Sequence, residues 1–354
     1  MPSSTPFPAD TAPNNACVFT FPFPVYVDTH SAFGIQERRI ERRNFRIYPF
    51  FRSGPANFVP APAIDPAKIP LSDGKKGADI PKKALPLLAG LPAMRQEKSA
   101  SVILSCGSEF ENKSLQYFPM DSLRIDVFGG SGSPDDASKL VHVLLDWIKV
   151  ETKQWWIGRE LPMGGRHYLR SVIPISRKGR FTRSAEGMGG FVTMRGDEIP
   201  LDSTLWYRVL KRLEKGDEPE DYQFLLLDAK YHSAINEARR AVIDAAVACE
   251  QATERTFVSI VESQWGLNFK HGKYFTKYDL TKHINQDMKS LIGCEFSDAD
   301  PDADNGVGLL WKCRGDLAHG KHRVVQYDQL KKMINSAEKC IEWLEFIRAK
   351  NWKK

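Results

Sequence analysis

Residues 313–322 read CRGDLAHGKH and place a guanidinium, a carboxylate and an imidazole close together, on Arg314, Asp316 and His319. A histidine can accept and return a proton near neutral pH, and an arginine stays protonated and can bind a phosphate through two N–H groups. Cleavage of RNA without a metal, in which the 2′-hydroxyl attacks its own phosphate, needs both kinds of group. Arg314 and His319 therefore form the candidate catalytic pair.

The residues that follow the histidine add further positive charge. Lys321, His322 and Arg323 lie just past Gly320 and are predicted to hold an RNA backbone. A structural interpretation accounts for the same residues, because cationic side chains are common in the last turn of a helix and glycine is common just after it. In that interpretation the arginine and the aspartate of the stretch are simply solvated.

Helical geometry limits how the candidate pair can act. A step of five residues turns about 140° around an α-helix, so Arg314 and His319 do not share one face. Contributions from two copies of the chain would solve this problem. We therefore expect a homodimer if the pair is catalytic.

The elements that must position the pair are helical. Residues 217–263 contain almost no helix breakers and carry apolar residues at steps of three and four, which predicts one long helix. Further helices are predicted at about 283–293, 306–319 and 327–350, and the helix at 306–319 ends at Gly320. Residues 219–351 are thus predicted to form an all-α bundle of four to five helices with short connections.

Small residues dominate the apolar stripe of the long helix, so a neighbouring helix can approach it closely. Glu250 lies on this small-residue face. A buried acid there needs a partner, and Arg314 is one candidate. The alternative is that Glu250 is a surface glutamate at the edge of the stripe.

The Ala-rich helix containing AVIDAAVACE, followed by a bundle that carries RGDLAHG near the end of its penultimate helix, resembles the HEPN superfamily. Within that superfamily it is similar to the group with the RNxxAHG motif. The resemblance covers about residues 220–350, and the N-terminal two-thirds of the chain resemble no family that we can name.

The resemblance implies a metal-independent endoribonuclease without a cofactor, acting on RNA at a homodimer cleft that receives one motif from each subunit. It assigns Arg314 and His319 as the catalytic pair. Bacterial members often serve in antiphage abortive infection or as toxins, with a phage component or partner protein as trigger. Members of the group usually have a polar residue directly after the arginine, and this chain has Gly315 at that position. Asp316, one position later, could take over the role of the polar residue. A non-catalytic module for dimerisation and RNA or protein binding is the alternative.

The N-terminal part has a different character. Residues 1–16 are predicted to be a flexible tail, and residues 17–215 a strand-rich α+β domain with a sensor or regulatory role. Its Pro-rich segment at 54–100 is predicted to be a long surface loop. A capped helix is predicted from Pro134 onward. The fold class of the whole chain is therefore α+β.

A basic and aromatic stretch, FGIQERRIERRNFRIYPFFRSG, begins at Phe33. One interpretation is a strand facing nucleic acid, with Arg42 and Arg43 among the RNA-binding residues. The other is an amphipathic strand or hairpin whose arginines are solvated. If the first holds, the N-terminal domain itself could be the part that grips nucleic acid.

Composition sets only broad limits on the partner. The chain has 354 residues and a net charge of +6, which permits a nucleic-acid partner without requiring one. No apolar run approaches the roughly 18–20 residues of a membrane span, and we see no signal peptide. The six cysteines show no CxxC or Cys/His spacing, which favours reduced thiols in the cytoplasm over a zinc site or a disulfide framework.

Overall fold

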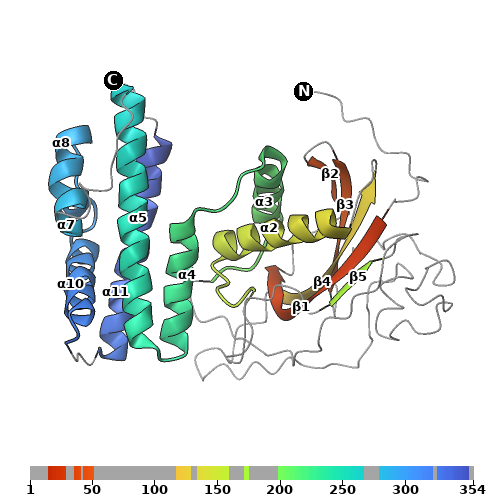
Figure 1. Cartoon of the computed structure of the whole chain (residues 1–354), viewed down its shortest axis with the longest axis horizontal. Coiled ribbons are helices and arrows are strands. Elements are labelled where there is room, and N and C mark those ends of the chain that lie inside the picture. The colour runs from red at the N-terminus through yellow and green to blue at the C-terminus, as the bar shows by residue number, and fades with distance from the viewer. Residues whose placement is uncertain are drawn as a thin grey trace. The chain divides into compact units, whose positions relative to one another are not determined.

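The structure is a computed structural model that describes residues 15–28, 36–40, 43–51, 117–128, 134–158, 171–174, 198–266, 279–321 and 325–350. The chain divides into two compact units, Met1–Glu218 and Pro219–Lys354. The first combines an antiparallel sheet with helices, whereas the described part of the second is helical (Figure 1). The predicted succession of a sheet-containing and a helical part is confirmed.

The described strands of the first unit form one sheet with the order β2-β3-β4-β1-β5, in which every neighbouring pair is antiparallel. The register of β1 on β4 shifts between Thr20 and Val25, so the strand continues past the prolines at 22 and 24. The strands are β1 (Asn15–Asp28), β2 (Gln36–Ile40), β3 (Arg43–Phe51), β4 (Tyr117–Phe128) and β5 (Ser171–Pro174).

Two helices complete the described core of this unit. Helix α2 (Pro134–Thr152) packs against β1 and β4, and α3 (Ser203–Lys215) packs against β2 and α2. Asp202 caps α3 by accepting a hydrogen bond from the backbone N–H of Leu205, and Gly216 ends it with a φ of 71°. The buried side chains of both helices join alternate residues of the strands in one hydrophobic core.

A single glutamine ties three distant segments of the first unit together. The side-chain oxygen of Gln154 accepts a hydrogen bond from the N–H of Tyr26, and its amide nitrogen donates to the carbonyls of Tyr26 and Ile199. The Gln154 side chain therefore acts as a short strand neighbour for β1. Sequence periodicity carries no signal for such a contact.

Some predictions concern segments that cannot be compared with the structure. The Pro-rich segment at 54–100 and most of the tail lie outside the described residues. The predicted tail was two residues too long, because β1 already begins at Asn15. Asn15 and Ala16 pair with Val127 and Asp126 on β4, and this pairing extends β1 to Asn15.

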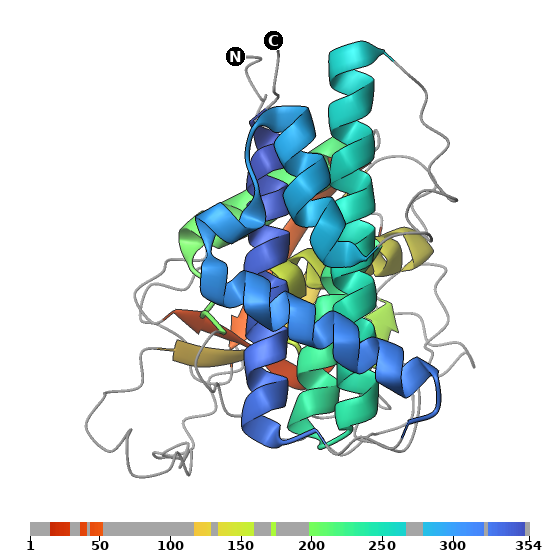
Figure 2. The same cartoon turned by 90° about the vertical axis from the view of Figure 1, so that its left-hand side faces the viewer.

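In the second unit, α5 and α11 lie side by side and α10 crosses them obliquely (Figure 2). The long helices are α4 (Asp221–Ala234), α5 (Ala238–Trp265), α10 (Pro301–Ala318) and α11 (Tyr327–Ala349). The short elements between them are α7 (Leu280–Lys282), the π-helical turn η4 (His283–Asp287), α8 (Met288–Ile292) and α9 (Phe296–Ala299). No helix among the described residues is long and apolar enough to cross a membrane.

The prediction of one continuous helix across 217–263 was wrong. The segment is divided into α4 and α5, and Asn236 in the connection has a φ of 62°. Asparagine tolerates this left-handed conformation better than most residues, so the chain reverses without glycine or proline. The imidazole of His232 and the carboxylate of Asp244, 2.7 Å apart, join the two helices beyond the turn.

The small residues of α5 permit close helix packing, as predicted. Ala241, Ala245, Ala248 and Ala252 are buried against their neighbours. The thiol of Cys249 lies 3.7 Å from the carbonyl oxygen of Ala337, so α11 approaches α5 closely at this point. Contact between α10 and α11 is equally close, because a methyl group added at Gly306 would lie 2.0 Å from the hydroxyl oxygen of Ser336.

Two glycines of α10 are expected to respond to alanine with opposite signs. Gly306→Ala forces α10 and α11 apart and should lower the free energy of unfolding by about 1–3 kcal/mol. Gly315→Ala meets no atom within 4 Å and should raise it by up to about 1 kcal/mol, because alanine is the better helix former. Urea unfolding followed by circular dichroism measures both. Equal effects of the two substitutions would contradict the close packing at Gly306.

Candidate functional site

Residues 313–321 of the CRGDLAHGKH stretch form the last turns of α10 and its C-terminal cap. The backbone N–H of Gly320 donates to the carbonyl of Leu317, and the N–H of Lys321 donates to the carbonyl of Asp316. With a φ of 72° at Gly320, these two bonds make a Schellman cap. The prediction that Gly320 ends the helix is confirmed, and this cap places His319 at the helix end.

Arg314 belongs to α10, and its side chain contacts one residue of α10 and one of α5. Its guanidinium lies 3.7 Å from a carboxylate oxygen of Glu250 and 4.8 Å from the centre of the Trp311 ring. The Arg314 and Glu250 side chains are 36% and 27% exposed, so neither is removed from solvent. Glu250 is therefore a half-buried acid at the edge of the small-residue stripe, and Arg314 is its partner.

The geometry leaves Arg314 able to exchange its partner. At 3.7 Å the ion pair with Glu250 is longer than a hydrogen bond, and half-exposed pairs of this kind contribute little to stability. The central carbon of the guanidinium lies over the Trp311 ring, and its N–H groups make no hydrogen bond with the described residues, so they can bind an oxyanion. A phosphate could therefore take the place of Glu250 at modest cost.

His319 is exposed at the end of α10, and the described residues make no hydrogen bond to its imidazole. Its ring is thus accessible for proton transfer. No bond or ion pair joins it to Arg314, and the two residues occupy different faces of the helix, as their spacing predicts. One described subunit does not bring the candidate pair together.

The supporting residues of the motif interact with one another. A carboxylate oxygen of Asp316 accepts a hydrogen bond of 3.0 Å from Lys321, whose side chain is 69% exposed. This ion pair reduces the positive charge that Lys321 can offer to a nucleic acid. His322 and Arg323 are the other two residues that were predicted to contact the RNA backbone, and they lie outside the described residues.

One cation beside the motif was missed by the sequence analysis. The guanidinium of Arg239, at the start of α5, donates a hydrogen bond of 3.3 Å to the carbonyl of Leu317. Positive charge at this place complements the negative end of the α10 dipole. Only the Arg239–Arg240 dipeptide at the beginning of the Ala-rich segment could have signalled it.

The described residues of the basic stretch form the antiparallel strands β2 and β3, and three of their four arginines are paired with acids. Arg43 forms an ion pair with Asp136, and Arg46 donates a hydrogen bond of 2.6 Å to Glu37. Arg38 is likewise paired, with Glu214 at 3.1 Å. These contacts favour the structural interpretation of the hairpin. Arg42 lies outside the described residues, so RNA binding by Arg42 and Arg43 stays a prediction.

Within the described ranges, no group of three or more His, Cys, Asp or Glu side chains is arranged to hold a metal ion. Comparisons of the chain with protein-family models, with curated proteins and with solved structures find no match. A functional interpretation therefore rests on the residues of the site themselves.

Proposed function

We propose that the helical unit is a metal-independent endoribonuclease of the HEPN type that acts as a homodimer. The observation that carries the proposal is the arrangement at the end of α10. There the imidazole of His319 is exposed, and Arg314 is positioned by Trp311 and Glu250. A titratable base and a fixed cation on neighbouring turns are the groups that cleavage by the 2′-hydroxyl needs.

In the proposed reaction, His319 accepts the proton of the 2′-hydroxyl as that oxygen attacks the adjacent phosphorus. The bond from phosphorus to the 5′-oxygen breaks, and this oxygen takes up a proton from a second imidazole. The products are a 2′,3′-cyclic phosphate and a 5′-hydroxyl. Arg314 stabilises the extra negative charge that develops on the phosphate oxygens.

A second copy of the chain explains how the groups can meet. His319 and Arg314 point from different faces of one helix, so a phosphate held by Arg314 is poorly placed for His319 of the same subunit. In a symmetric dimer the same surface patch occurs twice, and the two helix ends can face each other across the axis. Such a cleft holds two imidazoles and two guanidiniums, which supplies both a base and an acid.

The proposed biological role follows the family resemblance. An RNA-cleaving effector in antiphage defence or a toxin needs control, and we assign the sheet-containing unit a sensor or regulatory role with a phage component or partner protein as trigger. The cytoplasm, where RNA is present, is the expected compartment.

A non-catalytic dimerisation or binding module is the second candidate function. Gly315 favours it, because this position usually carries the polar residue that helps to organise the cleft. The ion pair between Arg314 and Glu250 is compatible with it too. RNA binding without cleavage, unchanged by His319→Ala, would support this candidate.

The test uses the full-length protein and total RNA with a chelator present, so that metal-dependent nucleases are silent. Wild type is expected to cut the RNA, whereas Arg314→Ala and His319→Ala are expected to leave it intact. Arg255→Ala is the matched control, because Arg255 is an exposed arginine that pairs with Glu220 elsewhere in the same unit. Intact RNA with wild type, or equal cleavage by all variants, contradicts the proposal.

Restoring a polar side chain at position 315 is expected to increase cleavage. A Cβ atom added at Gly315 has no atom within 4 Å, so the asparagine side chain of Gly315→Asn starts from open space. An amide at this position can help to orient groups in the cleft, and we expect a rate increase of about tenfold, a modest share of the effect of one oriented donor. Single-turnover cleavage of a labelled RNA measures it. Gly315→Ala separates the amide from the simple effect of added helix stability.

A further inference from the structure

A polar depression of about 530 Å³ lies between the η4 region and the N-terminal half of α10. None of the described residues of the CRGDLAHGKH motif lines it. All of its lining residues are polar or glycine: Thr281, Lys282, Asn285, Gln286, Asp304, Asn305 and Gly308. The volume suits one nucleotide-sized group. A depression lined in this way would bind a ligand through hydrogen bonds rather than through an apolar contact.

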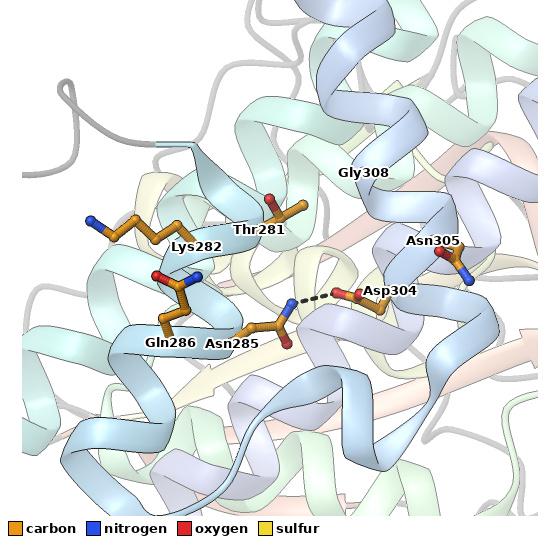
Figure 3. A pocket seen from close by; sticks show the side chains of 7 residues that line it. All are labelled: Thr281, Lys282, Asn285, Gln286, Asp304, Asn305 and Gly308. Carbon is orange, nitrogen blue, oxygen red and sulfur yellow. Dashed lines mark hydrogen bonds between the residues drawn. The ribbon is translucent and has the colours of Figure 1, made fainter.

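The floor of the depression is rigid. The amide nitrogen of Asn285 donates a hydrogen bond of 2.8 Å to Asp304 (Figure 3). Its amide oxygen accepts one of 2.9 Å from the N–H of Ser297. Asn285 belongs to η4, and π-helical turns often occur at functional sites. Figure 3 shows Asn285 and Thr281 directed towards α10. The Asp304 carboxylate is thus fixed in place before any ligand arrives.

Unused hydrogen-bonding capacity surrounds this floor. The Asp304 oxygen that binds Asn285 is one of two, and a carboxylate can accept about four hydrogen bonds. The side-chain amides of Gln286 and Asn305 make no hydrogen bond with the described residues. They lie on opposite sides of the depression (Figure 3). A ligand would therefore meet a fixed acceptor below and adaptable amides at the rim.

The depression and the catalytic end of α10 lie along one line. Asn305, Lys312 and His319 follow each other at seven-residue steps, and all three side chains are exposed. Seven residues turn α10 almost twice, so these residues lie near one face, with about 21 Å of helix from the first to the last. Exposed Lys312 lies midway. A few nucleotides of single-stranded RNA span this length, within the usual site sizes of about 4–16 nucleotides.

We propose that this depression binds an unpaired guanine base of the RNA substrate and so selects where the RNA is cut. Guanine presents two adjacent N–H donors on its Watson–Crick edge, which suit the Asp304 carboxylate, and a carbonyl oxygen, which suits the amide of Asn305. Adenine, cytosine and uracil do not present two adjacent donors. The inference rests on the proposed ribonuclease function.

The charge of the depression favours a base over a phosphate. Asp304 would repel a phosphate placed on the floor. Lys312 can hold the next phosphates on the way to His319. Base recognition in the depression and backbone contact along α10 are thus separate tasks.

Binding is tested with the full-length His319→Ala protein, which keeps the RNA intact. Labelled RNA of about twelve nucleotides is used, either with two adjacent guanosines or with adenosines in their place. Fluorescence anisotropy is expected to show at least about tenfold tighter binding of the guanosine RNA. Asp304→Asn should abolish this preference, since it keeps an acceptor for Asn285 but replaces half of the carboxylate by a donor.

Asp302→Asn is the matched control, because Asp302 is an exposed acid of the same helix that does not line the depression. It should leave the preference unchanged. Equal binding of both RNAs, no binding of either, or a preference that survives Asp304→Asn overturns the inference. Cleavage by wild type without a guanosine preference would sink this inference alone. A guanosine preference without cleavage would contradict the proposed ribonuclease function but would still support the guanine-binding site.

Discussion

Replacing His319 by alanine is expected to lower the rate of RNA cleavage by about a hundred- to ten-thousandfold. This is the usual contribution of one general acid or base. His319 is the C-cap residue of α10, and its exposed imidazole makes no hydrogen bond with the described residues. Its loss should therefore leave the fold intact. Single-turnover cleavage of a labelled RNA gives the rate, and circular dichroism checks that the variant is folded.

Mixing variants tests whether the two catalytic groups come from different subunits. Arg314→Ala and His319→Ala are each expected to be inactive. A mixed dimer keeps the arginine of one subunit and the histidine of the other, so the base and the cation can still meet. Partial activity should therefore return, with water replacing the second imidazole as the proton donor. Refolding the two variants together, followed by the same cleavage measurement, tests this. Failure to regain activity in a confirmed mixed dimer contradicts the composite cleft.

Asp126→Ala is expected to lower the free energy of unfolding by about 3–5 kcal/mol, the largest stability effect that we predict. Arg124 and Asp126 are two residues apart on β4, point to the same face, and are both fully buried. The guanidinium donates two hydrogen bonds to the carboxylate, of 2.7 and 2.9 Å. Alanine at 126 removes both acceptors while the buried charge of Arg124 stays.

Urea unfolding followed by tryptophan fluorescence measures this loss, with Arg208→Ala as the control. Arg208 pairs with Glu151 at 2.9 Å, but its side chain is 53% exposed, so its removal should cost far less. The double replacement Arg124→Met with Asp126→Leu should recover much of the loss, because it removes both charges together. If Asp126→Ala does not fold, Asp126→Asn gives the same comparison. A loss no larger than that of Arg208→Ala would contradict the argument.

Local patterns allowed much of the fold to be predicted. The apolar stripe of α11, the cap at Gly320 and the proline at the start of α2 depend on neighbours within a few residues, and each feature lies where it was expected. The break between α4 and α5 was missed because Asn236 is a weak signal compared with glycine or proline. Pairing of β1 with β4, about a hundred residues apart, has no local signal at all.

The site divides in the same way. The residue types and spacing of the motif determined, from the sequence alone, that Arg314 and His319 end one helix and leave it on different faces. Only the tertiary structure decided that Glu250 and Trp311 contact Arg314. It also decided that Arg239 binds the end of α10, and that Asn285 meets Asp304 in a depression beside the same helix. These contacts join residues between 3 and 78 positions apart, and all except Trp311 come from separate helices. Helix packing sets such meetings, and no periodicity along the chain encodes them.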